Sequence, residues 1–152
     1  MLGGTVYKRR ALKAVIIRVF IDYGGVKVGV LSIHHVSLVV ADTQRAVNFY
    51  HGVLGLEVCQ DRPDLGFPGA WLSIGEQQIH LLEVVVNPGA VDRPVHGGRD
   101  RHLAMSVDDL SDVEQKLNAQ EICFTRSRSG RQALFCRDPD GNGVELIQSD
   151  LM

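Results

Sequence analysis

The stretch that decides the fold is I-H-H-V-S-L-V-V-A-D at residues 33–42, because R-H-L-A-M-S-V-D-D at residues 101–109 repeats its pattern. In each stretch a histidine, His35 or His102, lies at the start of an apolar run that predicts a strand. An aspartate follows the run and can cap a helix. The chain is therefore predicted to contain two copies of one structural unit.

Each copy also ends on a residue that can bind a metal. The first ends on His80 in Q-Q-I-H-L-L-E, and the second on Glu145 in G-V-E-L-I-Q. His80 follows His35 by 45 positions, and Glu145 follows His102 by 43 positions. Two copies of one unit can bring four such residues to one point, so a metal site is the leading functional hypothesis.

Apolar periodicity and turn residues predict the order β-α-β-β-β in each copy. In the first copy we expect a helix after Asp42 and strands at 33–40, 56–59, 70–74 and 78–84. In the second we expect a helix after Asp108 or Asp109 and strands at 101–107, 121–125, 132–136 and 143–148. The predicted fold is α+β, with two tandem βαβββ modules curling around one metal-binding cleft.

We expect a single domain at residues 31–150. Module one covers 31–86, a linker rich in proline and glycine covers 87–100, and module two covers 101–150. Residues 1–30 have no counterpart in the second copy and form an extension, either a hairpin around Gly24-Gly25 or a disordered segment. Arg18 and Asp22 interrupt its apolar run, which argues against a secretory signal.

The composition argues against nucleic-acid binding, binding to an anionic membrane and a membrane-spanning protein. The net charge of −2 gives no electrostatic case for nucleic acid or an anionic membrane as a partner, and no run of residues is apolar enough to span a bilayer. The three cysteines are Cys59, Cys123 and Cys136. Their odd number and their spacing predict buried thiols in a reducing compartment, and hence a cytoplasmic protein.

The candidate ligands lie in strands among small or apolar residues rather than among surface charges. His35 shares its face with Ser37, and His102 shares its face with Ala104, so both imidazoles lie beside small residues. Glu145 lies between Val144 and Leu146, where a carboxylate is costly to bury unless something pairs with it. Three imidazoles and one carboxylate suit Zn, Ni, Co, Fe(II) or Mn better than Ca or Mg.

Two further features are candidate substrate contacts. Arg126, Arg128 and Arg131 lie in a polar loop that could bind a substrate carboxylate or phosphate, or could simply be solvated. Trp71, which follows the loop at 62–69, is either a core residue or a platform for substrate.

These residues form motifs of a known family. The pattern H-V-x-L-V-V-x-D-x-x-x-A-x-x-F-Y-x-x-V-L-G-L at residues 35–56 resembles the vicinal oxygen chelate superfamily, and so does F-C-R-D-P-D-G-N-G-V-E-L at 135–146. That superfamily includes glyoxalase I, extradiol dioxygenases and bleomycin-binding proteins. The resemblance covers about residues 33–148 and places its metal ligands on four residues, which are His35, His80, His102 and Glu145.

The resemblance implies a divalent-metal-dependent lyase or isomerase of glyoxalase type, acting on a small hemithioacetal-like substrate through an enediolate. It also implies a homodimer. Bacterial-type glyoxalase I typically has glutamate at the position of His80, so here only Glu145 can be the carboxylate base. The alternatives are an extradiol-type dioxygenase, using His35, His102 and Glu145, and a non-catalytic protein that binds or sequesters a small molecule.

Overall fold

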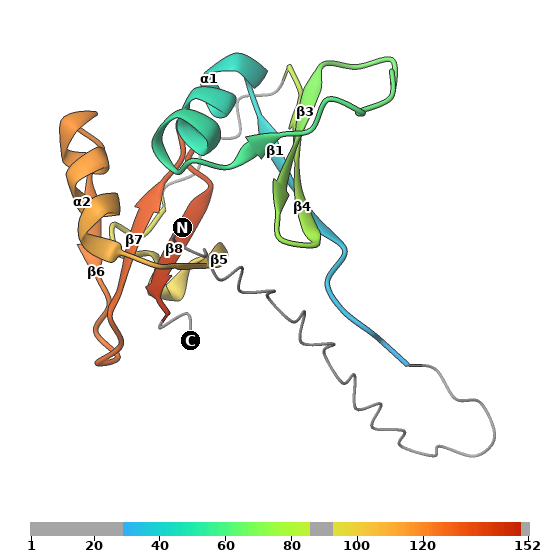
Figure 1. Cartoon of the computed structure of the whole chain (residues 1–152). Helices are drawn as coiled ribbons and strands as arrows, with labels where there is room; N and C mark the ends of the chain where they lie inside the picture. The colour runs from blue at the N-terminus through green and yellow to red at the C-terminus, as the bar shows by residue number, and fades with distance from the viewer. Residues whose placement is uncertain (1–28, 86–92, 150–152) are drawn as a thin grey trace, which may run out of the picture. The chain divides into compact units, whose positions relative to one another are not determined.

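The computed structural model describes residues 29–85 and 93–149 (Figure 1). Both modules belong to one compact unit that begins at Ile33. The expected extension at residues 1–30 lies outside the described residues except for its last two positions. The first part of the expected linker, up to residue 92, also lies outside them.

Module one is a four-stranded sheet with one helical segment (Figure 1). The strand order is β1-β4-β3-β2, with β1 parallel to β4 and the other pairs antiparallel. Its elements are β1 (His35–Val40), α1 (Thr43–Val47), the π-helix η1 (Asn48–Val53), β2 (Glu57–Val58), β3 (Gly69–Ile74) and β4 (Gln77–Glu83).

Module two repeats this plan with the strand order β5-β8-β7-β6, and β5 is parallel to β8. Its elements are β5 (His102–Val107), α2 (Leu110–Ala119), β6 (Phe124–Arg126), β7 (Ala133–Arg137) and β8 (Gly143–Gln148). A 3₁₀ turn, η3 (Gly97–Arg99), precedes β5. The predicted tandem βαβββ architecture is confirmed.

Local chemistry explains the helix starts. The carboxylates of Asp42 and Asp109 accept hydrogen bonds from backbone N–H groups of the first turns of α1 and α2, as N-caps do. The type of the first helix and the start of β6 differ most from expectation. The first helix continues from α1 into a π-helix that the sequence pattern did not predict. Strand β6 begins at Phe124 because Glu121, with φ of 54°, lies in a left-handed turn after α2.

Strand β1 alternates as predicted. Val36, Leu38 and Val40 of β1 face the core side, while His35 and Ser37 lie on the open face.

The prediction for the cysteines is only partly correct. Cys136 is buried in the core, Cys59 is half-buried, and Cys123 is exposed because it lies on the surface segment between α2 and β6.

A buried polar network joins the two modules. The turn between β7 and β8 contains Asp138, Asp140 and Asn142. Asp140 accepts hydrogen bonds from Arg45 and from the backbone N–H of Ala41, and the amide of Asn142 donates to the carbonyl of Val39. The last turn of module two is thereby fixed to the end of β1.

No helix within residues 29–85 and 93–149 combines the length and the apolar character needed to cross a membrane.

Candidate metal centre

Module one brings two of the four candidate ligands together. His35 on β1 and His80 on β4 lie with their rings stacked, 4.1 Å between centroids and 10° between planes. The parallel pairing of β1 with β4 sets this arrangement, because Ser37 is the register partner of His80 and His35 precedes it by two residues on the same face. We call these two histidines the module-one half-site.

Trp71 covers the other side of His80. Its ring is stacked on the His80 ring at 4.4 Å, since Trp71 on β3 and His80 on β4 are register partners. The structure therefore places Trp71 at the half-site, with its indole N–H buried and without a hydrogen-bond partner in the described part of the chain. His80 is sandwiched between Trp71 and His35, and only 9% of it is exposed.

This environment favours the neutral form of His80. Burial lowers the pKa of the His80 imidazole below its ordinary value, and electrostatic interaction with the neighbouring His35, His34 and Arg62 side chains lowers the pKa further. A neutral imidazole keeps a lone pair for a metal. The ring nitrogen Nε2 of His80 is 2.9 Å from the amide oxygen of Gln78, a residue that was not predicted from the sequence to belong to the site.

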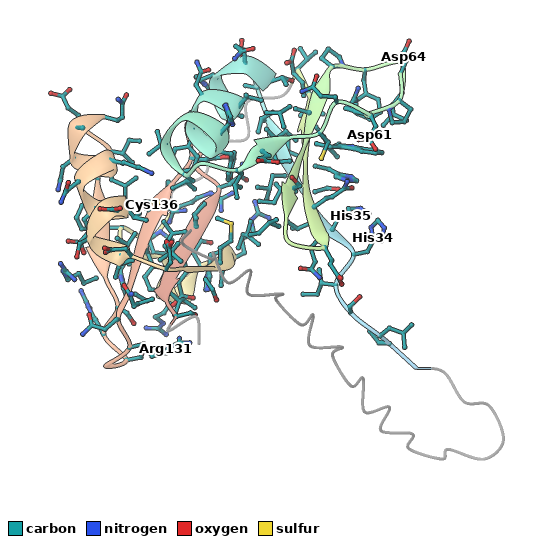
Figure 2. All side chains as sticks on the ribbon, viewed as in Figure 1. His34, His35, Asp61, Asp64, Arg131 and Cys136 are labelled. Atoms are coloured by element: carbon teal, nitrogen blue, oxygen red, sulfur yellow. The ribbon has the colours of Figure 1, made fainter. Side chains whose placement is uncertain are left out.

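His34 also contacts the half-site. The sequence places it on the opposite face from His35, but its ring reaches His35 with 2.9 Å between the two Nδ1 atoms. Figure 2 shows both histidines at the start of β1, and His34 directly precedes the first residue of this strand.

Module two brings the other two candidate ligands together. His102 on β5 donates from Nε2 to Glu145 Oε2 on β8 over 3.1 Å. The Nδ1 atom of His102 is 2.8 Å from the backbone carbonyl of Asp100, which holds the other side of the ring. Glu145 is only 3% exposed, as expected for a residue between two apolar neighbours. We call His102 and Glu145 the module-two half-site.

Phe135 forms one wall of the module-two half-site. It is the register partner of Glu145, and the His102 ring meets it edge-on at 5.3 Å. His96 packs edge-on against the same phenyl ring at 5.0 Å and hydrogen-bonds to the Thr125 hydroxyl on β6. Phe135 was not predicted as a site residue from the sequence. The repeat could have predicted it, because Phe135 on β7 pairs with Glu145 just as Trp71 on β3 pairs with His80.

The three loop arginines have different positions. The guanidinium of Arg131 is 3.6 Å from Glu145 Oε1, and Figure 2 shows Arg131 at the turn between β6 and β7. Arg126 forms an ion pair with Glu114 of α2 instead, and Arg128 is exposed. Of the three loop arginines, only Arg131 reaches a candidate ligand.

The two half-sites remain separate. Among the residues that the structure describes, no group of three or more His, Cys, Asp or Glu side chains is arranged to hold a metal. A cavity of about 980 Å³ runs along β1 and β5 and is lined by His35 and His102, but His80 and Glu145 do not line it. Most of its remaining wall is apolar and includes Val36, Leu38, Leu103 and Met105.

The donor set nevertheless fits a transition metal. Glu145 Oε1 is buried and has no hydrogen-bond partner in the described residues. The guanidinium of Arg131 lies 3.6 Å from this oxygen as an ion pair but makes no hydrogen bond to it, so a metal cation could still bind there. Imidazole nitrogens and a carboxylate oxygen are ligands that Zn, Ni, Co, Fe(II) and Mn accept.

Comparison with known proteins identifies relatives of this chain. The chain is 31% identical over 124 residues to Glyoxylase I 4 of Arabidopsis thaliana, covering 78% of this chain and 71% of that protein. It is 31% identical over 122 residues to lactoylglutathione lyase of Escherichia coli O157:H7, covering 75% and 90%. The crystal structure of lactoylglutathione lyase from Agrobacterium tumefaciens aligns with a TM-score of 0.55 and 26% identity, covering 79% of this chain and 95% of that one.

The profile of the family described as Glyoxalase/Bleomycin resistance protein/Dioxygenase superfamily matches residues 32–146, which include both half-sites. Those residues span the two βαβββ modules almost completely. The chain belongs to the Glyoxalase/Bleomycin resistance protein/Dioxygenase superfamily.

Proposed function

We propose that the protein is a divalent-metal-dependent lyase of glyoxalase type that isomerises a small hemithioacetal. The observation that carries the proposal is the buried Glu145 carboxylate, which has one oxygen on His102. Its other oxygen lies 3.6 Å from the Arg131 guanidinium and has no hydrogen-bond partner in the described chain. The similarity to proteins named lactoylglutathione lyase supports this substrate class.

His35, His80, His102 and Glu145 would hold the metal. When bound, the metal would supply Lewis acidity toward the two adjacent oxygens of the substrate. Glu145 would act as the base, because it is the one carboxylate among the four. It takes the proton from the carbon that bears sulfur and returns a proton to the adjacent carbonyl carbon, so the reaction requires no oxidant.

Other side chains would orient the substrate. The guanidinium of Arg131, close to Glu145, offers a cationic contact for an anionic group of the substrate. Trp71 and Phe135 present aromatic walls beside His80 and Glu145, and they would exclude water from the reacting carbons.

We assign the complete site to a homodimer in which module one of one subunit faces module two of its partner. Two observations support this assignment. The candidate ligands form two pairs within the described chain rather than one group of four. Strands β1 and β5 each form an edge of their sheet beside a largely apolar cavity, and such edges are suited to being covered by a second chain.

The test is metal analysis of the purified full-length protein, followed by a turnover assay. We expect about one divalent transition metal per complete site and turnover of the hemithioacetal formed from methylglyoxal and glutathione, stimulated by Ni or Zn. Iron with oxygen uptake on catechols would instead identify a dioxygenase. A protein that neither contains nor gains metal on dialysis would be a binding protein, and the proposal would be wrong.

A further inference from the structure

Gln78 makes two contacts in module one that the candidate metal ligands alone do not explain. Its amide donates from Nε2 to the Cys59 sulfur at 3.8 Å, and its oxygen Oε1 is 2.9 Å from His80 Nε2. The sulfur takes the donor end of the amide, so the acceptor end faces the imidazole. An acceptor at this position requires the proton of a neutral His80 to be on Nε2.

The strand geometry holds Gln78 in place. Gln78 and His80 are two residues apart on β4, so their side chains share a face of the sheet. Across the parallel ladder, Gln78 is the register partner of His35. It is therefore adjacent to both histidines of the module-one half-site. The stacked rings of Trp71 and His35 prevent the His80 ring from tilting away from this contact.

Module two has no counterpart of this amide. The register partner of His102 is Gly143, the position that corresponds to Gln78 in module one. A Cβ atom at Gly143 would lie 2.8 Å from the Arg101 carbonyl oxygen, so no side chain fits there. His102 instead contacts the backbone carbonyl of Asp100 through Nδ1. The two half-sites thus orient their histidines through different ring nitrogens.

We propose that Gln78 is a positioning residue that fixes the tautomer of His80, holding the proton on Nε2 and leaving the lone pair on Nδ1. The inference deepens the proposed function and rests on it where metal binding is concerned. A second hydrogen bond on a ligating histidine fixes the ring and raises its basicity, and losing such a partner typically weakens metal binding about 10- to 100-fold.

The first test uses the metal-free protein. In ¹⁵N-histidine-labelled protein at pH 8, the imidazole nitrogen shifts of His80 should report the Nε2–H tautomer, with the resonances assigned by their loss in His80→Gln. In Gln78→Leu the shifts should move toward a mixture of tautomers, and in Gln78→Glu the Nε2–H form should persist. A wild-type His80 protonated on Nδ1, or an unchanged spectrum in Gln78→Leu, would overturn the proposal.

The second test measures zinc affinity by competition with a chromogenic chelator. Gln78→Leu should bind zinc about 10- to 100-fold more weakly, and Gln78→Glu should restore the affinity. The matched control is Gln77→Leu, one residue away on the other face of β4, with wild-type affinity expected. Equal affinities for Gln78→Leu and wild type would contradict the proposal. If wild-type protein binds no zinc, the metal function fails, while the tautomer measurement still decides the role of Gln78.

Discussion

The hydroxyl of Tyr50 donates a hydrogen bond to Asp138 Oδ2 over 3.0 Å, and both residues are buried. Tyr50 belongs to η1 of module one, and Asp138 belongs to the turn between β7 and β8 of module two. Asp138 also accepts hydrogen bonds from the backbone N–H groups of Asp140 and Asn142, so its carboxylate is surrounded by donors. This contact couples the stability of one module to the other.

Replacing Tyr50 with Phe should lower the free energy of unfolding by about 1.5–3 kcal/mol, because a buried carboxylate loses a donor. Urea denaturation of the full-length protein measures the change. Thr43→Val is the matched control, since the Thr43 hydroxyl is buried and has no hydrogen-bond partner in the described residues. A Tyr50→Phe protein no less stable than Thr43→Val would show that the hydrogen bond contributes little.

The pH dependence of stability should reveal the burial of Asp138. Burial raises the pKa of Asp138 in the folded protein, although hydrogen bonds from Asn142, Tyr50 and Asp140 partly oppose this rise. A raised pKa favours the folded state in acid. The stability of wild type relative to Asp138→Asn should therefore be highest below the ordinary pKa of aspartate. It should decrease as pH rises through the raised value, and an increase over that interval would contradict the assignment.

Glu145→Gln should separate chemistry from metal binding. The amide cannot take a proton, so turnover of the hemithioacetal should fall by about two to four orders of magnitude, while zinc should still be retained. Steady-state kinetics and metal analysis of one preparation measure both. The same substitution at Glu114, which pairs with Arg126 on the surface of α2, is the control. Turnover that survives in Glu145→Gln would mean that another group is the base.

Mixing two inactive variants tests the dimeric site. His80→Gln disables module one and Glu145→Gln disables module two. After unfolding and refolding together, about half of the dimers should be mixed, and each mixed dimer should hold one intact site, giving about a quarter of wild-type activity. Native mass spectrometry measures the mixed fraction. Activity no higher than that of either parent, with mixed dimers present, would place all four ligands within one subunit.

Gly97→Ala should disturb the module-two half-site from the linker side. A Cβ atom there would lie 2.8 Å from the Phe135 ring, and Phe135 packs against His102. We expect a loss of about 1–3 kcal/mol in the free energy of unfolding from overpacking. Gly52→Ala is the control because a Cβ atom on Gly52 has no neighbour within 4 Å. Thermal denaturation compares the two, and an equally small effect would show that Phe135 can move aside.

Much of the architecture could be predicted from local patterns. Period-two alternation placed His35 and His102 on the open faces of β1 and β5, and Asp42 and Asp109 cap the helices as expected. The π-helix η1 and the late start of β6 were missed. Both depend on a local backbone conformation, the second on the left-handed Glu121, that apolar periodicity does not report.

The sequence by itself determined the two modules, the strands that contain the four candidate ligands and the faces of those strands, because these follow from periodicity and repetition along the chain. Only the tertiary structure decided which side chains meet. The stack of Trp71 on His80, the contact of Gln78 with His80 and the separation of the ligands into two pairs all depend on strand register and on how the sheets pack. Those relationships join residues of different strands, and no local pattern encodes them.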